Sequence, residues 1–220
     1  MSYKHSNLFV MLPYEQRDKV AGYFDLDVVG EEYANLLGNL TDMLAEYAIL
    51  KNDTGKDTVI ATILRAGQAI SNRLALRLPD ANVVKINMRR NIHTLKPFVA
   101  WDEFSKIDMP EKKKLIITDP ALATGGSVLK ALELAMEHGF KEEKTIILSM
   151  FGGELGLEKV LETYPDVKIY LTHMADGIRE DGYLNIPVRQ HRKSGRRETV
   201  CPGLRKPLMR VYSRNVLSKP

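Results

Sequence analysis

The chain has 220 residues, of which 44% are hydrophobic and 27% charged, as is ordinary for a globular protein. This length suits one domain with a sizeable core and is too short for two. The apolar runs are too short to span a bilayer, the N-terminus lacks the apolar stretch of a secretory signal, and the one cysteine, Cys201, excludes an internal disulfide. We therefore expect a single cytoplasmic domain with no membrane partner.

Positive charge is concentrated near the C-terminus. The formal net charge is +4, yet the segment 189–219 carries ten basic residues and only one acid, Glu198. Such a segment suits phosphate groups, nucleic acid or an acidic partner surface. A solvated, mobile C-terminus explains the same charges equally well, so both interpretations stay open.

The first half of the chain alternates between helix and strand patterns. Residues 30–50 predict an amphipathic helix, because apolar side chains recur there at helical spacing. The β-branched run 58–64 predicts a strand that is buried on both faces. A second helix is expected over 68–78, and a second strand over 83–86.

The second half continues the alternation after one irregular stretch. Residues 88–110 hold an arginine pair, two prolines and the only tryptophan without a clear period, so we expect a loop or a hairpin. A helix is expected from Ser127 to His138, closed by Gly139. The remaining predicted elements are strands at 115–118, 145–149 and 167–172, and a helix at about 155–163.

This order of elements predicts an α/β fold. Short apolar strands that alternate with helices indicate βαβ units and a mostly parallel sheet. Ligands of such sheets bind beyond the carboxyl ends of the strands. We therefore expect the functional residues in the loops that follow Leu64, Ile86, Thr118 and Thr172. The glycine cluster 152–156 is interpreted as a strand-to-helix connection.

One of these loops has the residue types that bind phosphate. Its sequence is Asp119-Pro120-Ala121-Leu122-Ala123-Thr124-Gly125-Gly126-Ser127. At the start of a helix the backbone N–H groups lack partners and the dipole is positive, so an anion is stabilised there. The glycines allow close approach, Thr124 and Ser127 add hydroxyl donors, and Asp119 suits a ribose hydroxyl or a magnesium-bound water. The alternative is a plain strand–turn–helix connection in which Ser127 is only the N-cap.

The same string resembles the loop that binds phosphoribosyl pyrophosphate (PRPP) in uracil phosphoribosyltransferases. The shared pattern is D-P-x-L-A-T-G-G-S, with an aliphatic residue at x. The resemblance implies that all nine residues from Asp119 to Ser127 bind PRPP and that Asp119 takes part in catalysis. The spacing fits neither a Walker A loop, which needs a lysine after the glycines, nor the dinucleotide fingerprint.

The segment Ile63-Leu-Arg-Ala-Gly67 is similar to the pyrophosphate loop of the same family. The similarity implies that Arg65 holds the diphosphate, for which its fixed charge and five donors are well suited. Without the neighbouring phosphate loop, a surface arginine at the start of a helix would be the better interpretation.

The segment Met88–Pro97 resembles the family stretch M-Y-R-N-E-E-T-L-E-P. The match implies that Arg90 reaches PRPP as a binding and catalytic residue. The family has a mobile flap at this place, which here would be residues 98–106. Its aromatic side chains suit ordinary packing as well as a substrate role: Phe98, Trp101 and Phe104.

The segment Asp181–Pro187 resembles the family's base-recognition loop, G-Y-I-x-P, with one extra residue. The resemblance implies that Tyr183, Leu184 and Ile186 bind the base through backbone groups, which can read a pyrimidine edge without special side chains. After Pro187 the family continues with P-G-L-G-D-A-G-D-R, whereas this chain continues with the basic segment. The choice of nucleobase, and activity itself, therefore stay open.

Taken together, the resemblance implies a type I phosphoribosyltransferase fold. The single domain 1–220 would have a core at about 50–175, a hood from 1–30 and 176–220, and a flap at about 88–110. It would transfer phosphoribose from PRPP to uracil, giving UMP and pyrophosphate, with Mg²⁺ bound mainly through PRPP and with a homodimer or higher homo-oligomer as the assembly. The alternatives are a transferase for another base and, less favoured, a regulator of this fold that binds RNA through its basic C-terminal segment.

Overall fold

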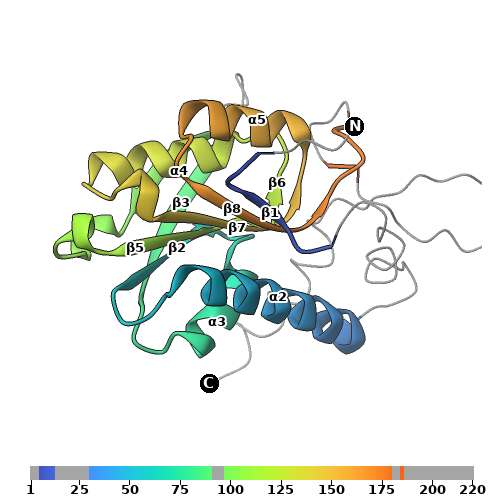
Figure 1. Cartoon of the computed structure of the whole chain (residues 1–220), viewed down its shortest axis with the longest axis horizontal. Coiled ribbons are helices and arrows are strands. Elements are labelled where there is room, and N and C mark those ends of the chain that lie inside the picture. Colours follow the sequence, from blue (N-terminus) through green and yellow to red (C-terminus); the bar gives the residue numbers. More distant parts are fainter. Residues whose placement is uncertain (1–4, 13–29, 91–96, 180–183, 186–220) are drawn as a thin grey trace, which may run out of the picture.

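The computed structural model describes residues 5–12, 30–90, 97–179 and 184–185. Within these ranges the chain forms one eight-stranded sheet in the order β1-β8-β7-β5-β2-β3-β4, with β6 paired to β7 (Figure 1). All pairs are parallel except the antiparallel pair of β3 and β4. The strands are β1 Leu8–Val10, β2 Thr58–Leu64, β3 Asn82–Arg90, β4 Pro97–Asp102, β5 Lys114–Thr118, β6 Ala121–Leu122, β7 Thr145–Gly152 and β8 Lys168–Met174.

Four α-helices in the described ranges cover the sheet. Figure 1 shows α4 and α5 on one face and α2 and α3 on the other, which confirms the mostly parallel α/β architecture. Short 3₁₀ turns at 104–106, 110–112 and 142–144 join some of the elements. The α-helices are α2 Gly30–Asn52, α3 Gln68–Arg77, α4 Gly126–Glu137 and α5 Glu154–Thr163.

The central strands are buried because their side chains are apolar on both faces. The first six residues of β2 are all buried, as the β-branched run 58–64 predicts. Its alternate residues therefore contribute to two cores. One face, under α4 and α5, holds Val59, Ala61 and Ile63. The other face, under α2 and α3, holds Ile60 together with the helix side chains Leu40 and Leu74.

The structure adds two strands that the sequence pattern did not indicate. β1 is only three residues long, too short for a period to be recognised, and it extends the sheet beyond β8 although it falls in the range expected for the hood. β6 lies inside the phosphate loop, where Ala121 pairs with Phe151 and Leu122 with Gly152. Both strands are held by pairing with distant segments, which local sequence does not encode.

The irregular stretch 88–110, for which the sequence predicts a loop or a hairpin, is partly a hairpin. β3 runs on to Arg90, well beyond the predicted end at Ile86, and β4 returns antiparallel to it. Residues 91–96 between them lie outside the described residues. Phe104 is 1% exposed and belongs to the core under α4, so ordinary packing is the correct interpretation of this aromatic side chain. Phe98 and Trp101 on β4 are 44% and 45% exposed.

Among the helices described, none combines the length and the hydropathy that a membrane-spanning segment needs.

Candidate active site

The carboxyl ends of the parallel strands meet at one edge of the sheet, and the predicted site residues lie there. Arg65 follows β2 directly and is exposed. Arg90 is the last residue of β3, the strand beside β2. Asp119 follows β5, the neighbour of β2 on the other side, and is half-buried. The structure therefore gathers at one edge three residues that are far apart in the sequence.

The first half of the phosphate loop is held against β7 by backbone hydrogen bonds. The N–H of Asp119 donates to the carbonyl of Leu148 over 3.2 Å. The N–H of Phe151 donates to Pro120 O over 3.1 Å, and that of Gly153 to Leu122 O over 2.9 Å. These bonds make the segment Pro120–Leu122 an extension of the sheet rather than a free loop. The direction in which the loop enters α4 is thereby fixed.

The second half of the loop turns sharply into α4. Gly125 is the N-cap residue and has φ +77°, a left-handed conformation that favours glycine because a Cβ would crowd the backbone. Among the described residues no side chain caps this helix. The first-turn N–H groups of α4 have no partner within the helix, so an anion at this point meets several donors and the positive end of the dipole.

The two hydroxyl residues of the loop flank that helix start. Thr124 is exposed and Ser127 is half-buried. Ser127 lies in the first turn of α4, whereas the N-cap position belongs to Gly125. The interpretation of Ser127 as a mere N-cap is therefore wrong.

The Arg65 loop packs directly on the end of β5. A Cβ built on Gly67 would lie 2.2 Å from the carbonyl oxygen of Thr118, so only glycine fits there. The Thr118 hydroxyl lies 3.2 Å from the carbonyl oxygen of Gly67 and donates to it. The peptide bond between Leu64 and Arg65 is cis. Because Thr118 precedes Asp119, these contacts bring the Arg65 loop next to the phosphate loop.

The start of β4 lies over the start of α4. A Cβ built on Gly126 would be 3.5 Å from Cγ of Pro97, which is ordinary van der Waals contact. Pro97 is also the register partner of Arg90 across the hairpin. The backbone of Arg90 therefore lies one strand away from a residue that touches the helix terminus. The side chain of Arg90 is outside what the structure describes.

The segment expected to bind the base is described only at Leu184 and Asn185. The backbone N–H of Asn185 donates to Gly177 O over 2.8 Å, and the N–H of Asp176 donates to Asn185 O over 2.9 Å. Leu184 is 4% exposed, and its side chain belongs to the core under α2 and α3. Tyr183 and Ile186 lie outside the described residues.

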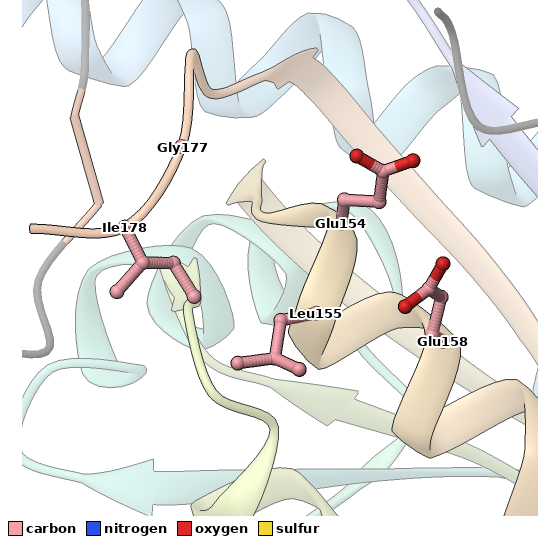
Figure 2. Close-up of a pocket in the computed structure, with 5 residues that line it drawn as sticks. All are labelled: Glu154, Leu155, Glu158, Gly177 and Ile178. Atoms are coloured by element: carbon pink, nitrogen blue, oxygen red, sulfur yellow. The ribbon is translucent and has the colours of Figure 1, made fainter.

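A pocket of about 420 Å³ lies between α5 and the segment after β8. Figure 2 shows the carboxylates of Glu154 and Glu158 on one side of α5 and the side chains of Leu155 and Ile178 on the other. These two carboxylates would repel the phosphates of PRPP. The pocket is thus a poor place for a diphosphate, and the phosphate loop is the better one.

Gly153 and Gly156 at the start of α5 contact the phosphate loop, a role that the sequence did not predict for them. The interpretation of 152–156 as a strand-to-helix connection is confirmed, because β7 ends at Gly152 and α5 begins at Glu154. Both glycines touch the phosphate loop in space. The signal was visible as a glycine cluster, but its contacts are tertiary and have no local pattern.

Comparisons with known proteins show the family of the chain. The family model described as uracil phosphoribosyltransferase matches residues 39–187. A uracil phosphoribosyltransferase of Clostridium acetobutylicum is 32% identical over 180 residues, which are 76% of this chain and 84% of that protein. One of Limosilactobacillus reuteri is 36% identical over 136 residues, 61% of this chain and 63% of that protein, so this alignment spans under two thirds of the relative.

Among solved structures, the AQ2163 protein from Aquifex aeolicus is similar to this chain with a TM-score of 0.69. The match covers 82% of this chain and 93% of that one at 22% sequence identity, and so it supports the fold alone. The family match covers the phosphate loop, the Arg65 loop and the segment that ends at Pro187. This chain belongs to the uracil phosphoribosyltransferase family.

Proposed function

We propose that this chain transfers the phosphoribosyl group of PRPP to uracil, with UMP and pyrophosphate as products. The observation that carries the proposal is the meeting of the phosphate loop and the Arg65 loop at one sheet edge, through the contact of Gly67 with Thr118. One loop suits the 5-phosphate and the other suits the diphosphate. PRPP carries a phosphate at one end of its ribose and the diphosphate at the other, so each loop would bind one end of the molecule.

The 5-phosphate of PRPP would bind at the start of α4. The N–H groups of the first turn, the hydroxyls of Thr124 and Ser127, and the helix dipole supply donors and positive potential there. Asp119, half-buried at the other end of the loop, would accept hydrogen bonds from the ribose hydroxyls. These contacts hold the anomeric carbon at a fixed place beyond β5.

The diphosphate would lie against Arg65, with Arg90 as a second cation. In the reaction, a ring nitrogen of uracil forms a bond to the anomeric carbon and gives up its proton, while the bond to the diphosphate breaks. The diphosphate leaves with the bonding electrons. Positive groups aimed at it stabilise this charge as it develops, without a nucleophile from the protein.

We also propose that Mg²⁺ binds to the protein together with PRPP. In the described ranges, no group of three or more His, Cys, Asp or Glu side chains could hold a metal ion. Magnesium commonly keeps several waters and binds through one or two carboxylates plus substrate phosphates. The carboxylate of Asp119 fits that arrangement, and the ion would there offset the negative charge of the diphosphate.

The base would be read by backbone groups of Tyr183, Leu184 and Ile186. Support comes from the bridge between Ile178 and Leu184 and from the position of both residues close to Gly153 at the start of α5. A cytoplasmic location and a homodimer or higher homo-oligomer remain part of the proposal. The relatives support a uracil transferase and give no support to a regulator that binds RNA.

The test is substrate discrimination by the whole chain. The protein is incubated with Mg²⁺ and PRPP and with each of uracil, hypoxanthine, adenine, guanine and orotate, and released pyrophosphate is measured. We expect release with uracil alone. Release with a different base would replace uracil in the proposal, and no release with any of the five from folded protein would overturn the transferase function.

A further inference from the structure

The turn that starts α5, residues 153–156, lies between the phosphate loop and the base segment, by which we mean the described residue Leu184 and its bridge partner Ile178. Gly153 is the N-cap residue of α5, and Gly156 lies in its first turn. Each glycine faces a different neighbour, at a distance at which an added Cβ would force that neighbour to shift. We call this segment the α5 entry turn.

Gly156 faces the phosphate loop. A Cβ built on it would lie 2.4 Å from the carbonyl oxygen of Ala123 and 2.6 Å from Cδ2 of Leu122. The carbonyl oxygen of Gly156 in turn would lie 2.9 Å from a Cβ on Gly125, the left-handed residue that starts α4. The backbone of the loop and the backbone of α5 are thus in direct contact on both sides of Thr124.

Gly153 faces the base segment. A Cβ built on it would lie 2.8 Å from Cδ2 of Leu184 and 3.3 Å from Cγ1 of Ile178. Figure 2 shows Ile178 beside the first turn of α5, close to Leu155. The backbone of Gly153 also donates to Leu122 O, so this one residue touches both segments. Its φ of −96° and ψ of 144° suit any amino acid, so an alanine there is opposed by its neighbours alone and not by its own backbone.

We infer that the α5 entry turn sets the distance between the phosphate loop and the base segment, with Gly156 and Gly153 as its positioning residues. This inference rests on the proposed function, in which one segment holds the 5-phosphate and the other the base. A Cβ on Gly156 would meet the phosphate loop, whereas a Cβ on Gly153 would first meet side chains of the base segment, so a methyl group at Gly156 displaces the phosphate side and a methyl group at Gly153 displaces the base side. A merely structural role would not separate the two substrates in this way.

The first variant is Gly156→Ala. Alanine favours a helix interior over glycine by about 1 kcal/mol, so the helix itself is not weakened. The displaced loop raises the KM for PRPP by about 10- to 100-fold, because a shift of the order of 1 Å at a substrate contact has effects of that size. The KM for uracil stays within about twofold of the wild-type value.

The second variant is Gly153→Ala, which has the reverse effect. The new methyl group meets flexible side-chain carbons, so the Gly153→Ala variant should fold even if the Gly156→Ala variant does not. The KM for uracil rises several-fold, while the KM for PRPP changes less. Adding Leu184→Val withdraws the crowded carbon and brings the KM for uracil back toward the wild-type value.

Gly55→Ala is the matched control. No described heavy atom lies within 4 Å of a Cβ at Gly55, and its φ is not positive. This variant keeps both KM values. Thermal unfolding of all variants identifies those that are folded.

The dissociation constant of ribose 5-phosphate, measured by calorimetry, separates this inference from the proposed function. If the wild type turns over no uracil, the proposed function fails, but weaker ribose 5-phosphate binding by Gly156→Ala alone still supports the positioning of the phosphate loop. Equal changes of both KM values in the two folded variants, or no change in Gly153→Ala, overturn the inference.

Discussion

The backbone of Gly67 lies directly against the carbonyl oxygen of Thr118, so that a Cβ at residue 67 would be 2.2 Å from it. The Thr118 hydroxyl also donates to Gly67 O over 3.2 Å and lies 3.4 Å from Ala61 O. Through this contact the loop with Arg65 is fixed to the strand that ends at Asp119. The relative position of the two loops that would bind the charged ends of PRPP therefore depends on one buried junction.

Replacement of Thr118 by valine tests this junction. Valine keeps the shape of the side chain but removes the donor, so the Gly67 carbonyl loses this hydrogen bond and keeps the two that it accepts from backbone N–H groups in the first turn of α3. We expect the free energy of unfolding to fall by about 0.5–1.5 kcal/mol and the KM for PRPP to rise. Urea denaturation and steady-state kinetics measure both. Thr163→Val is the control, because this hydroxyl donates to Lys159 O on the exposed face of α5; an equal loss in the control would contradict the account.

Arg65 is expected to stabilise the leaving diphosphate. Arg65→Ala removes a fixed charge and its donors, and kcat/KM for PRPP falls by an amount that corresponds to about 2–4 kcal/mol of barrier. Arg65→Lys keeps the charge but loses the planar, forked donors of the guanidinium group, so its activity should lie between those of the wild type and Arg65→Ala. Arg77→Ala on α3, where Arg77 lies 3.5 Å from Asp42, serves as the distant control. An unchanged rate in Arg65→Ala would remove this residue from the mechanism.

Much of the fold was predictable because strong local patterns coincide with the real elements. The run 58–64 is β2 as predicted, and the helix expected over 30–50 is α2 at Gly30–Asn52. β1 and β6 were missed because two or three residues carry no period, and their pairing partners are far away in the sequence. The extension of β3 to Arg90 was missed because its partner β4 stabilises it.

The candidate site was predictable in its residue types but not in its supports. The string 119–127 indicated a phosphate site without any structure. The close contacts that orient it come from Gly67, Pro97 and Gly156, on three other elements. Such contacts depend on how the elements pack, and a single sequence has no local signal for them. The roles of all the predicted site residues, from Arg65 to Ile186, stay predictions.

Lys114 is expected to stabilise the fold without taking part in catalysis. Its ammonium group donates to the carbonyl oxygens of Asn52 and Asp53 at the end of α2, over 2.5 and 2.6 Å. A cation there satisfies the last carbonyls and the negative end of the dipole. Lys114→Met should lower the free energy of unfolding by about 1–2 kcal/mol with kcat unchanged. Lys56→Met, at an exposed position nearby, should change neither; a loss of kcat in Lys114→Met would contradict this assignment.

The buried phenol of Tyr170 should make the folded protein less stable at alkaline pH. Its ring is buried and stacks on Phe9 at 4.6 Å between ring centroids, and its hydroxyl accepts a hydrogen bond from Asn52 over 2.8 Å. Burial raises the pKa of the Tyr170 phenol above its ordinary value, with the Asn52 bond opposing this shift. Below the ordinary value the phenol is neutral in the folded and the unfolded chain, so its contribution to stability is fully present.

Above about pH 10 the phenol ionises first in the unfolded chain, and the free energy of unfolding falls as pH rises toward the folded-state pKa. Tyr170→Phe removes this group, so its stability should decline less steeply over the same range. Tyr164, whose pKa burial also raises, titrates in both proteins and cancels in the comparison. Parallel pH profiles for the wild type and Tyr170→Phe would show that this phenol is not the cause.

The central claim is tested most directly by following labelled uracil into UMP with PRPP and Mg²⁺, in the wild type and in Asp119→Asn. We predict that the wild type forms UMP and pyrophosphate in equal amounts. Asp119→Asn should lower kcat/KM for PRPP by about 100-fold or more, as for other groups that act on the reacting centre. Folded wild-type protein that forms no UMP, or an Asp119→Asn variant with the full rate, would contradict the account.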